Sequence, residues 1–345
     1  MPIIGSSASQ SGRVPGVPTS VSASAGNGQA TVSFTVPAYA GKGGTVSYTA
    51  TSSPGNFTAS GNSSPLTVTG LSNGTSYTFT VTASVGGVAG SASSASAGVS
   101  PINPPTVTGG TLSSDATYYY RTFTANGTLV VSDSTLTCDV LIGAGGGAGG
   151  SGAGSGGGSF TSNYSATAGS YNFVIGAAGN DSTGIGINAY KGGNSVASGN
   201  GLSGGSGGGG GISNNSSQVR SGGAATKASG GTITYGNAGG TSQATVFFTG
   251  SGGGGGWGGG GGGGPEDAGE YSVGGAAGSG INTYNSWSLA TGIGQLSGGT
   301  RWVGGGNSGT GQVSNPNGPG VGVNTAGAGS SGFVMVRYLR SAVGG

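Results

Sequence analysis

The chain has 345 residues, of which 88 are glycine, and it carries nine Lys or Arg, seven Asp or Glu and no His. A formal net charge of +2 from so few charges offers no basic stripe, so nucleic acid is not an expected partner. Without His, and with a single cysteine, the chain has little means of acid–base catalysis and no metal-ligand cluster of nitrogen and sulfur type. We therefore expect a non-enzymatic protein that needs neither cofactor nor metal.

Residues 1–13 begin Met1-Pro2-Ile3-Ile4 and show no periodicity. They lack the basic start and the apolar core of roughly 7 to 15 residues that mark a secretory signal. No apolar run reaches the roughly 18 residues that a membrane span needs, so we do not expect membrane insertion. We expect an arm at residues 1–13, with Ile3 and Ile4 docking on another protein.

Residues 14–100 consist of short runs in which apolar and polar residues alternate, separated by Gly, Pro and Asn turns. Such alternation predicts half-buried strands, and about seven of them predict an antiparallel β-sandwich. The runs are Val32/Phe34/Val36, Val46/Tyr48/Ala50, Leu66/Val68 and Tyr77/Phe79/Val81/Ala83.

The stretch Leu66–Val81 resembles the fifth and sixth strands of the fibronectin type III family. Leu71 followed by Tyr77 is similar to the tyrosine corner of that family, in which the phenol anchors a crossover between the two sheets. Phe34 stands where the family usually has a tryptophan. The resemblance implies a spacer or binding module over residues 14–100.

Residues 101–113 open with Pro101-Ile102-Asn103-Pro104-Pro105 and are predicted to be a stiff, Pro-rich linker. Residues 114–345 then form a glycine-rich β domain, which makes the whole chain all-β. Its predicted strands are Tyr118–Thr124, Asn126–Val131, the alternating run Leu136/Cys138/Val140/Ile142, the run Tyr171/Phe173/Ile175 and the closing Phe333–Leu339. Cys138 is expected to be a buried thiol without chemistry.

Glycine dominates this second domain: 69 of the 88 glycines follow residue 140, in runs such as Gly207–Gly211 and Gly258–Gly264. Collagen is excluded, because it needs glycine at every third position and abundant proline. Extended glycine segments can instead approach closely enough to bond backbone to backbone, as in polyglycine II, which would replace a hydrophobic core. The alternative is a flexible Gly/Ser linker.

The ordered series of these runs resembles the glycine-rich domain found at the ends of phage tail proteins and of some bacterial surface proteins. The matching pieces are Thr122-Phe123-Thr124, Gly127–Val130, Val140–Gly147, Tyr171–Gly179, the runs at 207–211 and 252–264, and Ser331–Tyr338. The resemblance implies a virion appendage without a catalytic role.

Other motifs are weaker. Gly143–Ala148 formally matches a dinucleotide-binding turn, but no helix-forming residues follow it. Asn-x-Ser/Thr triplets are frequent in a chain of this composition and are interpreted as turns. The acids Glu266, Asp267 and Glu270 cluster in a Gly/Pro-bounded segment that we interpret as a solvated loop.

The aromatic residues of the glycine-rich half are the best binding candidates, because exposed Trp and Tyr offer a flat apolar face with a polar handle. They would read a host-surface glycan or protein, or contact another subunit, with Arg301 beside them. The alternative is that they cap glycine strands and fill a small core. The candidates are Trp257, Tyr271, Tyr284, Trp287 and Trp302.

Together these patterns predict a phage virion protein, assembled in the host cytoplasm. It is expected to be a tail fibre or appendage subunit that docks on other virion proteins through its arm and works as a homo-oligomer. A capsid decoration or head fibre is the first alternative, and a subunit of an extracellular or cell-surface filament is the second. A depolymerase is least favoured, because glycoside hydrolysis needs two facing carboxylates and only residues 266–270 supply a pair.

Overall fold

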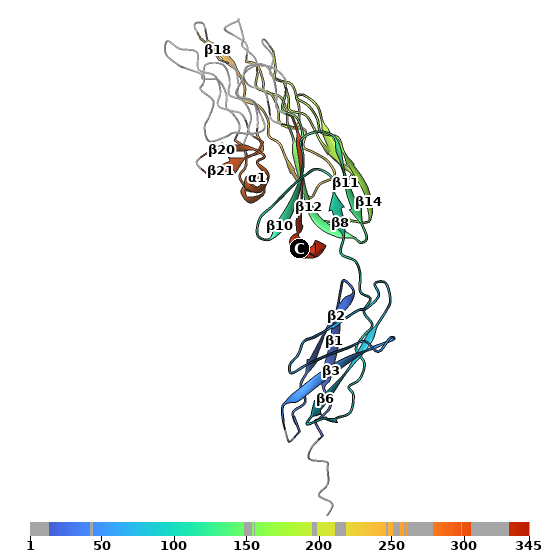
Figure 1. The fold of residues 1–345 in the computed structure, drawn as a ribbon. Coiled ribbons are helices and arrows are strands. Elements are labelled where there is room, and N and C mark those ends of the chain that lie inside the picture. Colours follow the sequence, from blue (N-terminus) through green and yellow to red (C-terminus); the bar gives the residue numbers. More distant parts are fainter. Residues whose placement is uncertain are drawn as a thin grey trace, which may run out of the picture. The chain divides into compact units, whose positions relative to one another are not determined.

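The computed structural model divides into two compact units, Met1–Pro104 and Pro105–Gly345, here called the sandwich unit and the glycine-rich unit (Figure 1). The architecture is almost entirely β, as the sequence predicts. The described residues are 14–41, 44–147, 154, 156–194, 199–210, 219–245, 248–250, 256–258, 260, 279–297, 299–304 and 331–344. The predicted docking arm, with Ile3 and Ile4, lies outside them.

The sandwich unit has two antiparallel sheets, with strand orders β1-β2-β5 and β4-β3-β6-β7. Alternate residues of each strand face inward, so that β6 buries Phe79, Val81 and Ala83 against Val32 and Val68. This is the alternation seen in the sequence. The strands are β1 Thr19–Gly26, β2 Gln29–Thr35, β3 Val46–Ser53, β4 Thr58–Gly61, β5 Leu66–Thr69, β6 Thr78–Val85 and β7 Val88–Ala89.

The predicted tyrosine corner is present. The Ser72 backbone N–H donates to the Tyr77 hydroxyl at 3.1 Å, and Tyr77 and Leu71 are both buried. Phe34 packs against Tyr48 with ring centroids 5.0 Å apart, and so fills part of the space between the sheets. The first contact anchors the crossover, and the second helps to fill the centre of the sandwich.

The glycine-rich unit is built on a six-stranded sheet of order β17-β13-β12-β22-β10-β9, beside a three-stranded sheet of order β14-β11-β8. The predicted strands at 118–124, 126–131, 136–142, 171–175 and 333–339 are confirmed as β10, β11, β12, β14 and β22. The elements of these two sheets are β8 Thr106–Thr108, β9 Thr111–Ser114, β10 Tyr118–Phe123, β11 Gly127–Ser132, β12 Leu136–Gly143, β13 Gly158–Ala166, β14 Gly169–Phe173, β17 Ile233–Tyr235 and β22 Phe333–Leu339.

Smaller elements complete this unit. They are the hairpin strands β15 Ser182–Gly184 and β16 Ile187–Ala189, β18 Gln243–Thr245 and β19 Phe248–Gly250, β20 Gln295–Ser297 and β21 Thr300–Trp302, the helix α1 Asn285–Thr291 and the closing 3-10 helix η2 Arg340–Val343. The sequence did not predict α1, which spans seven residues, contains no charged side chain and has no side-chain N-cap hydrogen bond.

The six-stranded sheet is covered on both faces (Figure 1). On one face, Val140 and Val336 pack against Leu129 and Phe173 of the three-stranded sheet. On the other face, aromatic and aliphatic side chains from β10, β12 and β22 meet α1 and residues 257 and 303. The central strand β22 therefore has buried side chains on both faces, which explains why its sequence is almost continuously apolar.

The predicted linker at residues 101–113 is too long. Residues 106–108 form β8, which pairs with β11, and residues 111–114 form β9, which pairs with β10. Val107 is buried in the core between the two sheets. The prolines that suggested the linker end at Pro105, where the second unit begins.

Candidate functional site

Four strands of the six-stranded sheet end in one row at the boundary with the glycine segments. Tyr235, Gly158, Gly143 and Phe333 are paired in that order across β17, β13, β12 and β22. Each is the terminal residue of its strand. The chain therefore leaves or re-enters the sheet four times at this row, here called the exit row, which gathers the glycine-rich segments at one end of the unit.

Beyond the exit row, backbone hydrogen bonds join glycine segments that are not strands of a sheet. Gly147 N–H donates to Gly154 O at 2.9 Å, and Gly154 N–H donates to Gly193 O at 2.9 Å. In a second series, Gly239 N–H donates to Gly223 O at 3.0 Å, and Gly223 N–H donates to Gly208 O at 2.7 Å. Main-chain bonds thus connect segments that are far apart in the sequence, which a flexible linker would not do.

The spacing of these segments excludes side chains. A Cβ at residue 207 would lie 1.8 Å from Gly223 O, and one at residue 193 would lie 2.0 Å from Leu202 O. Residues 204–210 are all buried, although they include no apolar side chain. Glycine is therefore needed at these positions because main chain packs directly against main chain.

Trp257 joins a glycine run to the exit row. Its indole ring is stacked on Tyr235, with centroids 5.1 Å apart and planes 9° apart, and its Nε1–H donates to Gly156 O. Added Cβ atoms at Gly158 and Gly304 would lie 2.2 and 2.1 Å from the indole, so both glycines make room for the ring. Trp257 is buried.

Tyr284 and Trp287 lie beside it on the same face of the sheet. Their rings contact each other at 5.6 Å between centroids, and both contact Phe160 of β13, at 5.2 and 5.9 Å. The Tyr284 and Tyr235 hydroxyls are 2.7 Å apart. Burial, together with that hydrogen bond, raises the pKa of Tyr284 well above its usual range, so the phenol stays neutral.

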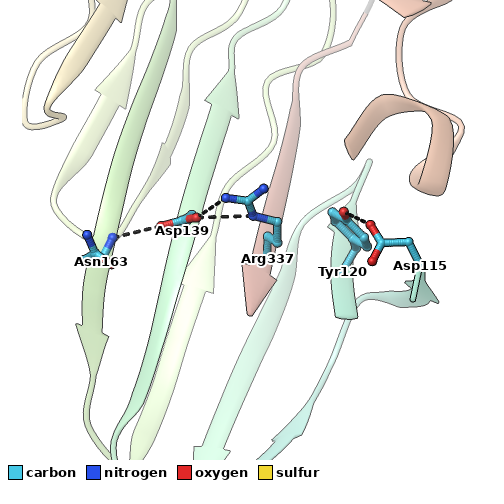
Figure 2. Close-up of polar contacts among 5 residues, drawn as sticks. All are labelled: Asp115, Tyr120, Asp139, Asn163 and Arg337. Atoms are coloured by element: carbon cyan, nitrogen blue, oxygen red, sulfur yellow. Dashed lines mark hydrogen bonds and ion pairs between the residues drawn. The ribbon is translucent and has the colours of Figure 1, made fainter. Parts of the chain in front are cut away.

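The charged centre of this face is an ion pair between neighbouring strands. Arg337 donates to Asp139 through Nη2 at 2.6 Å and through Nε at 3.2 Å (Figure 2). The guanidinium also lies over Trp287 and Tyr118, 4.4 and 4.3 Å from their centroids. Asp139 further accepts from the Asn163 backbone N–H at 2.9 Å. This network fixes β22 to β12, β10 and α1.

A second carboxylate organises the turn before β10. Asp115 Oδ1 accepts from the backbone N–H groups of Thr117 and Tyr118, and Oδ2 accepts from the Tyr120 hydroxyl at 2.5 Å (Figure 2). Partial burial acts to raise the pKa of Asp115, but these hydrogen bonds outweigh it and the net pKa is lowered. Burial and the bond to Asp115 raise the pKa of Tyr120 well above its usual range.

The structure corrects the expectation of exposed aromatic side chains. Trp257, Tyr284 and Trp287 are 2–6% exposed and fill the core on one face of the sheet, so they form no open binding surface. Trp302 is the last residue of β21. Tyr271 and the acids of residues 266–270 lie outside the described residues. Arg301 donates to the carbonyls of Gly292 and Gly294, and so closes a turn.

Nothing in the sequence pointed to Asp139, Phe160 or Tyr235 as site residues, and Arg337 carried only a local signal. Asp139 and Arg337 lie directly opposite each other on β12 and β22, but 198 positions separate them in the chain. An Arg inside an otherwise apolar closing strand was the one local signal of a buried partner.

Over the part of the chain that the structure describes, no three His, Cys, Asp or Glu side chains gather where they could hold a metal ion. Within the same residues, no helix has the length and apolar character needed to cross a membrane.

Comparison with known proteins identifies a fibronectin type III domain at residues 16–99. This family is typically a structural or binding module without catalysis. The solved structures similar to this chain include titin kinase with its flanking domains, at 14% identity and a TM-score of 0.23, covering 35% of this chain and 30% of that one. They also include the FN1–FN3 domains of chicken CNTN1, at 15% identity and a TM-score of 0.24, covering 48% and 62%. No curated protein matches the chain.

Proposed function

We propose that this protein is a non-enzymatic attachment protein of a bacteriophage virion, a subunit of a tail fibre or similar appendage. In this proposal the fibronectin type III domain is a spacer and the glycine-rich unit is the part that binds the host surface. The arm at residues 1–13 docks on other virion proteins. The observation that carries the proposal is the exit row, where four strand ends bring the two glycine-rich connections, residues 144–157 and 236–332, to one end of a sheet.

A row of this kind suits recognition for a mechanical reason. The sheet behind it has buried side chains on both faces and is tied together by the Asp139–Arg337 pair, so it makes a stiff support. Binding residues in proteins are commonly carried on connecting segments that a rigid scaffold positions. Backbone bonding between glycine segments, similar to polyglycine II, would extend that stiffness beyond the sheet without needing a large apolar core.

Attachment also fits a chain with few charges. Several copies on one particle, packed as a homo-oligomer, would combine weak contacts with a host-surface glycan or protein into strong overall adhesion, without a tight single site. The fibronectin type III domain adds reach in this arrangement, because a folded spacer moves the glycine-rich unit away from the particle without ordering a long flexible chain.

The test is immunogold electron microscopy of purified particles and of the host culture, with antibody raised against residues 120–345. The same antibody pre-absorbed with the purified chain is the control. The proposal predicts gold at tail tips or tail fibres. Gold over the capsid would replace it with a decoration or head-fibre role, and gold on free filaments would replace it with a filament subunit outside the virion.

A further inference from the structure

A recess lies beside the exit row, on the side of the three-stranded sheet. Most of its lining comes from residues 174–181, which connect β14 to β15. Its volume is about 530 Å³. This is within the range of roughly 300 to 1,000 Å³ that is typical of small-molecule sites. The recess is lined by Val174, Ile175, Gly176, Ala177, Asn180, Asp181 and Lys191.

The backbone around the recess is held on every side. Val174 and Thr183 exchange two hydrogen bonds of 2.9 Å, Asn180 O accepts from Gly145 N–H at 3.1 Å, and Gly176 O accepts from Gly332 N–H at 2.7 Å. A Cβ at Gly176 would lie 2.2 Å from Asn180 O, so only glycine at residue 176 lets the turn of residues 176–180 close. The walls are therefore ordered before any ligand arrives, which lowers the entropic cost of binding.

Asp181 and Lys191 each have a polar atom without a partner among the described residues, and Asn180 Nδ2, which donates to the Ala178 carbonyl at 3.4 Å, keeps a second N–H. Asp181 uses Oδ1 to accept from the Lys191 backbone N–H at 2.7 Å. Among the described residues, no hydrogen bond or ion pair uses Asp181 Oδ2 or Lys191 Nζ, and both side chains are exposed. Val174 adds an apolar surface, since its side chain is 49% exposed.

We propose that this recess binds a neutral saccharide. A hydroxyl group both donates and accepts, so a sugar can use Asp181 Oδ2 as an acceptor and the Lys191 ammonium and Asn180 amide as donors. The C–H face of the ring then covers Val174. A ligand with a net charge would be attracted by either Asp181 or Lys191 and repelled by the other. A neutral polyol can form hydrogen bonds with both.

This inference deepens the proposed attachment role, on which it rests for its biological setting, by naming the recess and the class of ligand. The experiment is saturation-transfer-difference NMR on the full chain. The probes are glucose, galactose, mannose, N-acetylglucosamine and their homodisaccharides, with sialic acid, glucosamine and inorganic phosphate as charged comparisons. Phosphate, which has no C–H protons, is followed by competition.

We expect at least one neutral sugar to receive saturation and the charged probes to bind more weakly. Lys191→Met and Asn180→Ala should each weaken that binding at least fivefold, because each removes a donor while the backbone bonds of the recess remain. Lys227→Met is the matched control: Lys227 is exposed and lies outside the recess, so its loss should leave binding unchanged. Unfolding curves of the variants that match the parent would show that the fold is intact.

Failure of wild type to bind any neutral sugar would overturn the inference, as would binding that both recess variants retain, or binding of the charged probes alone. These results are independent of immunogold labelling. Tail labelling without sugar binding would support the attachment role and refute the sugar site in the recess. Sugar binding without particle labelling would support the sugar site and refute the attachment role.

Discussion

The indole of Trp257 lies flat on the phenol ring of Tyr235, so residues 256–258, of which the other two are glycine, are fixed to the last residue of β17. The same ring occupies the space that two glycines, Gly158 and Gly304, leave open. One aromatic side chain thereby joins three segments at the exit row.

Replacing Trp257 tests this joint. Trp257→Ala should lower the free energy of unfolding of the glycine-rich unit by about 3–5 kcal/mol, because it empties a buried site of the largest side chain. Urea unfolding followed by the fluorescence of the remaining tryptophans reports this unit alone, since all three tryptophans of the chain lie in it. A loss below about 1 kcal/mol would mean that Trp257 does not fix the run.

Glycine-specific packing is tested by adding one methyl group. Gly207→Ala should destabilise the unit by about 2 kcal/mol or more, because the new Cβ would overlap the Gly223 carbonyl. Gly169→Ala is the matched control, since the nearest atom to its new Cβ is 3.9 Å away. The two variants are compared by tryptophan-detected urea unfolding, and equal stabilities would argue against close packing of the glycine segments.

Removing Arg337 should destabilise the protein more than removing Asp139, although the two residues form one ion pair. Arg337→Met is expected to cost about 2 kcal/mol and Asp139→Asn about 1 kcal/mol, because the guanidinium also lies over Trp287 and Tyr118. A double-mutant cycle in urea gives the coupling between them. Strictly additive losses would show that the pair contributes no interaction of its own.

The lowered pKa of Asp115 predicts that its contribution to stability is lost in acid. Its pKa is lowered in the folded state, so its stabilising effect is complete above the unfolded pKa near 3.9 and is lost as the pH falls through the lower folded value. Asp115→Asn should therefore be less stable than wild type at pH 6, and the gap should narrow as the pH falls below about 4. Urea midpoints measured from pH 6 to pH 3 check this, and a gap that widens in acid would contradict it.

Cys138 should be unreactive while the protein is folded. Burial raises the pKa of its thiol to about 12, so almost no thiolate exists at pH 8. Ellman's reagent should label it only after denaturation. Rapid labelling of the native chain would mean that the core between the two sheets opens.

Much of the fold could be read from the sequence because half-buried strands leave a period of two. The runs at Leu66 and Tyr77 gave β5 and β6 directly, and the apolar closing run gave β22. Strand β13 was missed because its middle, Thr161–Tyr164, is polar or only partly buried, so no apolar stripe marks it. Helix α1 was missed because a seven-residue uncharged segment has no amphipathic period to detect.

The candidate site was harder to predict. Composition identified Trp257, Tyr284 and Trp287 as aromatic residues among glycines, but their burial depends on the second face of the six-stranded sheet, which only the strand order defines. The exit row has the same origin: Gly143 and Phe333 are neighbours through pairing across strands, and nothing local in the sequence places them together.

The most direct test of the account is native-state hydrogen exchange of the glycine amides. Gly193, Gly210, Gly223 and Gly239 each donate a backbone hydrogen bond to another segment. The account predicts that these amides exchange orders of magnitude more slowly than an unstructured Gly/Ser peptide, and that Gly207→Ala removes much of the protection. Exchange at the unstructured rate in the wild-type protein would contradict it, and the glycine-rich segments would then be flexible linkers.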